Sequence, residues 1–66
     1  MPRENLKKAR QKAGMTQKQV AEYLGTSERY YRFIESGTRN GTFEVWDKLE
    51  DLFGVHQRIL REFSSD

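Results

Sequence analysis

Apolar residues recur at spacings of three and four along nearly the whole chain, which is the pattern of one buried face on a helix. The pattern is interrupted by glycines and short polar stretches, so it predicts several separate helices. No segment shows the strict alternation that indicates a strand, and there is no internal repeat. Five helices are predicted, over residues 2–13, 16–24, 27–36, 42–53 and 56–63.

The short link between the second and third helices is the most informative turn. Thr16 and Gln19 have the spacing of a capping box, in which each side chain satisfies a free backbone amide at the start of a helix. Gly25 ends the second helix, because the residue beyond a helix end often needs a positive φ. Ser27 starts the next helix almost at once, and so short a link favours a steep crossing, as in a helix-turn-helix over about residues 17–36.

The apolar faces of the helices predict the core of a compact all-α bundle of five short helices. In the first helix this face also carries Arg10, a cation that needs a partner if it is buried. The predicted core residues are Leu6, Ala9, Ala13, Met15, Val20, Ala21, Leu24, Tyr31, Ile34, Phe43, Trp46, Leu49, Leu52, Phe53 and Val55.

The third helix, Ser27 to Ser36, has aromatic residues on more than one side. Tyr31 and Ile34 are the natural buried pair, since they lie three residues apart. At ~100° per residue, the opposite face and its flanks then point outward. The residues left outside are Arg29, Tyr30, Arg32, Phe33 and Ser36, with Ser27 and Glu28 at the N-terminal end.

An outward face of this composition suits the major groove of DNA. Arginine binds the O6 and N7 atoms of guanine, apolar side chains contact the thymine methyl group, and Glu28 can accept from the amino group of cytosine. A helix-turn-helix also sets the start of its second helix against the base edges. From the residues alone, a solvated charged face with one exposed phenylalanine fits equally well, and small helical bundles also bind proteins.

Composition and charge narrow the classes of function. The 66 residues include no cysteine and one histidine, His56, so a disulfide or thiolate metal site is excluded and a zinc site is not expected. No catalytic constellation surrounds His56 and no glycine-rich phosphate loop is present, so we expect no enzyme, cofactor or small-molecule ligand. The net charge of +2 favours an anionic partner. Because no apolar run has the length of a membrane span or signal peptide, we expect a cytoplasmic protein with no membrane partner.

The span "LKKARQKAGMTQKQVAEYLGTSERYYRFIESGTRNGTFEVWDKLEDLFGV" resembles the Xre/Cro-type helix-turn-helix family of bacterial and phage transcriptional repressors, from about residue 6 to residue 60. The resemblance implies a lambda-repressor-like DNA-binding domain over residues 1–66, with the third helix as recognition helix. The matching features are Arg10, Met15-Thr16-Gln17, Val20-Ala21, Leu24-Gly25, Ser27, the Tyr31/Ile34 pair, Glu35-x-Gly37, Thr42 and residues 49–55.

The resemblance also implies where the DNA backbone is contacted. Gln17, at the start of the second helix, is expected to bind a phosphate, where helix amides favour an anion in any case. The loop Arg39-Asn40-Gly41 is expected to run along the DNA backbone. The predicted DNA-binding residues are Gln17, Ser27, Glu28, Arg29, Tyr30, Arg32, Phe33, Ser36, Arg39, Asn40 and Gly41.

The chain departs from the family pattern at several positions. Gly41 replaces a usual proline, which predicts a more mobile loop. Arg29, Tyr30 and Phe33 stand where small polar residues are common, so the base preference is expected to differ from that of other members.

An ion pair between Arg10 and Glu35 follows from combining the two lines of reasoning. Arg10 lies on an apolar helix face and needs a counter-charge, and the resemblance implies that Glu35, at the end of the recognition helix, supplies it.

The predicted function is a sequence-specific regulator of transcription, a repressor, that binds a double-stranded DNA operator. Apolar residues of the last helix exceed one narrow stripe, and a homodimer is expected to form through Ile59, Leu60 and Phe63. The alternative is a protein-interaction module, such as an antitoxin or the partner of an anti-repressor, built on the same bundle.

Overall fold

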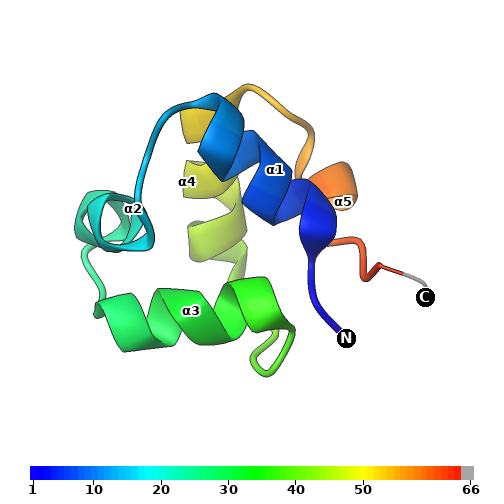
Figure 1. Cartoon of the computed structure of the whole chain (residues 1–66), viewed down its shortest axis with the longest axis horizontal. Helices are drawn as coiled ribbons and strands as arrows, with labels where there is room; N and C mark the ends of the chain where they lie inside the picture. The colour runs from blue at the N-terminus through cyan, green and yellow to red at the C-terminus, as the bar shows by residue number, and fades with distance from the viewer. Residues whose placement is uncertain (65–66) are drawn as a thin grey trace.

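The computed structural model describes residues 1–64 and contains five helices in that range, with no strand (Figure 1). The predicted all-α class is therefore correct. The helices are α1 (Glu4–Lys12), α2 (Gln17–Leu24), α3 (Glu28–Ser36), α4 (Phe43–Phe53) and α5 (Gln57–Leu60). In Figure 1, α3 lies along one edge of the molecule, α1 lies on the opposite side, and α4 fills the space behind and between them.

Side-chain caps fix the helix starts that orient α3. The Thr16 hydroxyl accepts from the Gln19 amide at 3.1 Å while the Gln19 side chain accepts from the Thr16 amide at 2.9 Å, so the capping box forms. The Ser27 hydroxyl accepts from the Tyr30 amide at 3.1 Å. Gly25 ends α2 with φ of 73°, which glycine adopts without strain. The steep turn between α2 and α3 is thus specified at both of its ends.

A single cluster of buried side chains joins all five helices. Trp46 and Tyr31 are its largest members, and the indole Nε1 of Trp46 donates to the Asn40 carbonyl oxygen at 2.8 Å. Satisfying the indole in this way lets a large ring lie fully inside a small core. The buried cluster consists of Leu6, Val20, Ala21, Leu24, Tyr31, Ile34, Trp46, Leu49 and Leu60.

Three features of the predicted fold are wrong. Ala13 was assigned to the core, yet it is exposed, just beyond the end of α1. Phe43 was assigned to the core, yet it is 80% exposed. It is the first residue of α4, and its ring lies on the outer surface of the bundle instead of in the core. The last helix was expected to reach Phe63, but it ends at Leu60.

Arg3 is buried, only 3% exposed, and no feature of the sequence predicted its role. Its guanidinium donates to three carbonyl oxygens, those of Ile34 at 2.6 Å, Arg39 at 2.9 Å and Arg61 at 3.0 Å. The cation also lies 4.5 Å from the ring centroid of Phe63 and 5.1 Å from that of Trp46. Arg3 therefore links the N-terminal segment to the end of α3, the following loop and the end of α5.

The two ends of the described chain meet beside this arginine. The Ser64 amide donates to the Pro2 carbonyl at 2.9 Å, and the Ser64 hydroxyl accepts from the Glu4 amide at 3.0 Å. Gly37 lies against the Met1 carbonyl so closely that a side chain there would collide with it. The segment before α1 is thus part of the packed structure.

We expect Arg3→Met to lower the free energy of unfolding by about 2–3 kcal/mol, because it leaves three carbonyl oxygens without their charged donor. Thermal and urea unfolding measure this change. The matched control is Arg58→Ala, which removes an exposed arginine of α5. Equal stability of Arg3→Met and the wild type would show that Arg3 does not hold these segments together.

Candidate nucleic-acid interface

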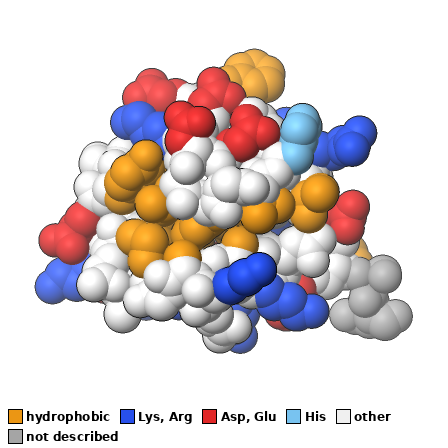
Figure 2. Space-filling model, turned by 90° about the horizontal axis from the view of Figure 1, so that it is seen from above, with side chains coloured by type: hydrophobic (Ala, Val, Ile, Leu, Met, Phe, Trp, Pro, Cys, Tyr) orange, Lys and Arg blue, Asp and Glu red, His pale blue; other side chains and the backbone are white. Residues whose placement is uncertain are grey.

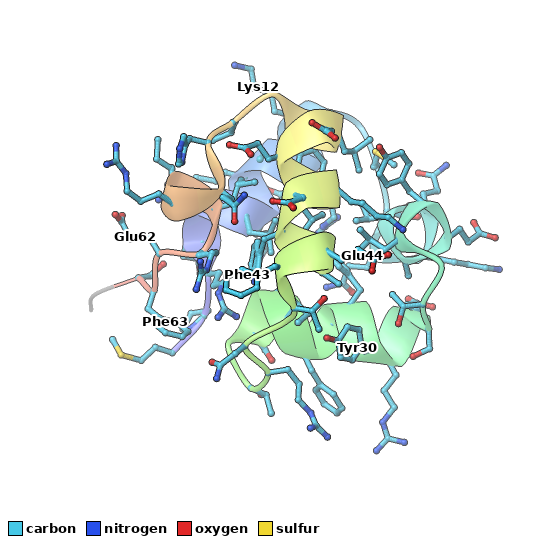
Figure 3. All side chains as sticks on the ribbon, turned by 180° about the vertical axis from the view of Figure 1, so that it is seen from behind. Lys12, Tyr30, Phe43, Glu44, Glu62 and Phe63 are labelled. Carbon is cyan, nitrogen blue, oxygen red and sulfur yellow. The ribbon has the colours of Figure 1, made fainter. Side chains whose placement is uncertain are left out.

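The outward face of α3 is polar and cationic, as the helical pattern predicted. Tyr31 and Ile34 are fully buried, whereas Arg29, Arg32 and Ser36 are exposed. Glu28, Tyr30 and Phe33 are partly covered, and Ser27 is exposed at the start of the helix. Tyr30 lies on the flank, on the same side as Phe43 and Glu44 at the start of α4 (Figure 3), and packs against the core.

The two arginines of α3 differ in the groups that they contact. Arg32 pairs with Glu28 one turn earlier, at 2.9 Å, and its Nε donates to the Gln17 side chain at 3.4 Å. Arg29 forms no salt bridge with any carboxylate of the described residues, and its guanidinium lies 5.6 Å from the ring centroid of Phe33. Arg29 is therefore the cation of this face that is available to a ligand.

The end of α3 is held by the ion pair between Arg10 and Glu35. Arg10 Nε donates to Glu35 Oε2 at 2.7 Å and Nη2 donates to Oε1 at 3.2 Å, a two-bond geometry that fixes both side chains. The exposed fractions are 13% for Arg10 and 6% for Glu35. The hydrogen bond to Glu35 raises the pKa of Arg10, and burial opposes that rise. Arg10 also donates to the Met15 carbonyl at 3.0 Å, so it reaches the turn before α2.

Gln17 joins this pair to the outward face. Its Nε2 donates to Glu35 Oε1 at 3.4 Å, while its Oε1 accepts from Arg32. A row of polar contacts therefore runs from Arg10 to Glu28 by way of Glu35, Gln17 and Arg32. The side chain predicted to bind a phosphate is held by protein groups in the free molecule.

Tyr31 packs beside the ion pair. Burial raises the pKa of its phenol well above the ordinary value, and the neighbouring Glu35 carboxylate adds to the rise. Tyr31 is therefore neutral over the range in which proteins are normally studied. Its buried hydroxyl has no hydrogen-bond partner of good geometry within the described residues.

The loop between α3 and α4 is anchored through its backbone. The carbonyls of Arg39 and Asn40 accept from Arg3 and Trp46, while both side chains are exposed. Gly41 has φ of 77°, which proline cannot adopt, and a Cβ there would lie 2.8 Å from the Trp46 indole nitrogen. Gly41 thus serves a close backbone approach, a reason for the departure from proline that the sequence did not show.

Acidic side chains gather along α4. Figure 2 looks at the face opposite α3 and shows them along one edge. Those of α4 are Glu44, Asp47, Glu50 and Asp51. Glu50 is also used structurally, since its carboxylate accepts from the Gln57 amide at 3.1 Å. The outward face of α3 itself carries one carboxylate, Glu28, which is paired with Arg32.

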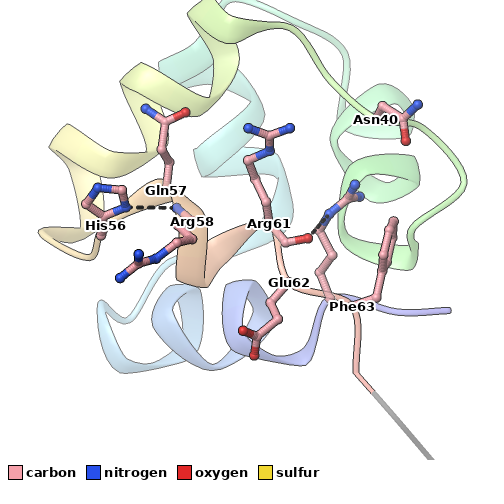
Figure 4. Close-up of a pocket in the computed structure, with 8 residues that line it drawn as sticks. Asn40, His56, Gln57, Arg58, Arg61, Glu62 and Phe63 are labelled. Atoms are coloured by element: carbon pink, nitrogen blue, oxygen red, sulfur yellow. Dashed lines mark hydrogen bonds between the residues drawn. The ribbon is translucent and has the colours of Figure 1, made fainter.

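An open hollow of about 530 Å³ lies between α5, the loop and the end of the described chain (Figure 4). Its polar groups contact one another: His56 Nδ1 accepts from the Arg58 amide at 3.0 Å, and Arg3 donates to the Arg61 carbonyl. Among residues 1–64 no three His, Cys, Asp or Glu side chains are grouped as a metal site requires. In the same residues no helix reaches the length and apolar character of a membrane span.

The helix-turn-helix family model matches residues 6–56, a span that contains α2, α3 and α4 whole. The chain belongs to the Xre-type helix-turn-helix family. It is also similar to a protein of Bacillus subtilis (strain 168) named as the uncharacterized HTH-type transcriptional regulator YqaF. The identity is 37% over 62 residues, which cover 94% of this chain and 82% of that protein. No solved structure matches the chain significantly. Arg3 and α5 lie outside the span of the family model.

We expect Arg10→Ala to lower the free energy of unfolding by about 3 kcal/mol, because it leaves the Glu35 carboxylate buried without its partner. Differential scanning calorimetry and urea titration measure the loss. Tyr31→Phe is the control from the same cluster; it removes a hydroxyl without a partner and should change stability by less than about 0.5 kcal/mol. An Arg10→Ala protein that melts with the wild type would exclude a structural role for the pair.

Proposed function

We propose that this protein is a sequence-specific regulator of transcription, a repressor, that reads the major groove of double-stranded DNA with α3. The observation that carries the proposal is Arg29, which forms no salt bridge within residues 1–64. It lies at the N-terminal end of a helix whose far end is anchored by Arg10 and Glu35. A helix-turn-helix presents this end of its second helix to the base edges. The family and YqaF support the coarser statement, a DNA-binding regulator.

Base contacts are proposed for the N-terminal half of α3 and its flanks. Arg29 is the first candidate for a base contact, because Arg32 is already paired with Glu28 and must exchange partners to reach a base. The full proposed set is Ser27, Glu28, Arg29, Tyr30, Arg32, Phe33 and Ser36.

Phosphate contacts are proposed at both ends of the helix-turn-helix. Gln17 lies at the start of α2, in a hollow lined also by Lys7, Arg32 and Ser36, where a phosphate oxygen would replace Glu35 as its partner. Arg39, Asn40 and Gly41 form the second contact, since the first two expose their side chains. Such contacts set the register on the duplex and carry no base preference.

Binding to mixed DNA at two salt concentrations tests this function. We expect the affinity to fall about 10- to 100-fold between 50 and 200 mM salt, as about two to four neutralised phosphates require.

Arg29→Ala should cost about 1–3 kcal/mol of binding free energy on the preferred site and relax the base preference at one position. The control is Lys18→Ala, which removes an exposed cation of α2. It should weaken binding to all DNA sequences alike, or to none of them. If Arg29→Ala weakens binding to every DNA sequence equally, Arg29 contacts a phosphate and not a base.

The alternative function is a protein-interaction module, such as an antitoxin or the partner of an anti-repressor. The observation in its favour is Phe43, an aromatic ring that is 80% exposed at the start of α4. No retardation of DNA at low salt, in the binding experiment above, would favour this alternative. The proposed regulator acts where its DNA lies, which for this family implies the cytoplasm.

We also propose a homodimer, since two-fold repressors of this architecture read half-sites about one helical turn apart. Leu60 is fully buried in the core of one copy and has no surface left for a second copy. The proposed contact is therefore reduced to Ile59 and Phe63, which are 43% and 47% exposed. Phe63 already packs against Arg3, so Ile59 is the better residue to change.

We expect sedimentation to give a dimer for the wild type on operator DNA and a weaker one for Ile59→Asp, because a charge would be buried at the contact. The melting temperature of Ile59→Asp should be unchanged, since the side chain is exposed within one copy. A wild-type protein that sediments as a monomer both free and on DNA would remove the dimer.

A further inference from the structure

Phe33 is the side chain on the outward face that the packing of the fold does not explain. It is partly buried, yet it is not among the residues that pack against the core. The other partly covered aromatic of this helix, Tyr30, does pack against the core. The guanidinium carbon of Arg29, one helical turn earlier, lies over the Phe33 ring at 5.6 Å from the ring centroid.

This contact orders a long, flexible side chain. The quadrupole of an aromatic ring attracts an arginine that lies over its face. At exposed sites this attraction shifts the equilibrium between the contacting and the non-contacting side chain about 2- to 5-fold. Arg29 forms no salt bridge in the described part of the chain, so the ring is what restrains its guanidinium. The ring accepts no conventional hydrogen bond from the guanidinium, so the guanidinium N–H groups can still bind guanine O6 and N7.

The ring then lies beside the base that Arg29 binds. A guanidinium that pairs with guanine lies in the plane of that base, and the next base pair is about 3.4 Å away along the duplex. A ring that lies over the guanidinium, with its centroid 5.6 Å away, is therefore placed toward the neighbouring base pair. In the major groove the apolar group there is the 5-methyl of a pyrimidine, carried by thymine and equally by 5-methylcytosine.

We propose that Arg29 and Phe33 act as one reading unit, in which Phe33 positions Arg29 on a guanine and itself contacts the 5-methyl group of the adjacent pyrimidine. This inference rests on the proposed DNA-binding function and states its specificity. It assigns Phe33 a double role, as a positioning residue for Arg29 and as a direct base contact.

Selection of bound sites from random DNA, followed by base-analogue substitution, tests the unit. We expect selected sites to share a guanine beside a thymine. Replacing that thymine by uracil removes only the methyl group and should weaken wild-type binding about 3- to 5-fold. Cytosine at the same position should bind as weakly as uracil, and 5-methylcytosine should restore the affinity, which separates the methyl group from the rest of the base.

Variants of Phe33 separate its two roles. Phe33→Ala should lose the response to uracil and reduce the preference for guanine about 2- to 5-fold. Phe33→Leu should keep the response to uracil, since it stays apolar, but lose the same guanine preference. Phe43→Ala removes an exposed ring from α4 and should leave both preferences intact. Melting temperatures should be equal for all of them, because neither ring packs against the core.

Two results would overturn the unit. Selected sites that respond neither to the methyl group nor to Phe33→Ala would remove it and leave the DNA-binding function standing. Failure to enrich any site, with no binding to mixed DNA at low salt, would instead overturn the proposed function itself, and the reading unit with it.

Discussion

The Glu35 carboxylate holds together the parts of the molecule that present α3. It pairs with Arg10 of α1 and accepts from Gln17 of α2, and the backbone carbonyl of the same residue accepts from the Arg3 amide at 2.8 Å. A buried carboxylate is favourable only when cations and donors surround it. Three segments that are distant in sequence must therefore arrive at the end of α3 before the helix has a fixed position.

Because one end of α3 is fixed in this way, its outward side chains need not contribute to folding. Their charges are arranged unevenly: Arg32 pairs with Glu28, whereas Arg29 has no carboxylate partner in the described part of the chain and lies over a ring. A cation that contacts an aromatic face keeps its hydrogen-bond donors free. A cation that pairs with a carboxylate already uses some of its donors in that pair. The difference between these two arginines, one turn apart on the same helix, is the main chemical asymmetry of the proposed DNA-facing surface.

The sequence was sufficient for features that depend on local periodicity and capping. The five helices, the tight turn after Gly25 and the inward pair Tyr31 and Ile34 all follow from spacing. It failed where position depends on distant backbone. Arg3 binds the backbone carbonyls of residues 34, 39 and 61. Because every residue has a backbone carbonyl, the sequence does not indicate which of them a side chain binds. Phe43 fitted the helical period but is the first residue of α4, and its ring is exposed.

Two different kinds of contact anchor α3. The Arg10–Glu35 contact is made by two charged side chains, so it depends on the identity of both residues. Arg3 binds the backbone carbonyls of residues 34, 39 and 61, and the side chains of those residues take no part in these hydrogen bonds. The tie to α1 is therefore sensitive to substitution at either of its ends, whereas the hydrogen bonds of Arg3 are sensitive to substitution at Arg3 itself.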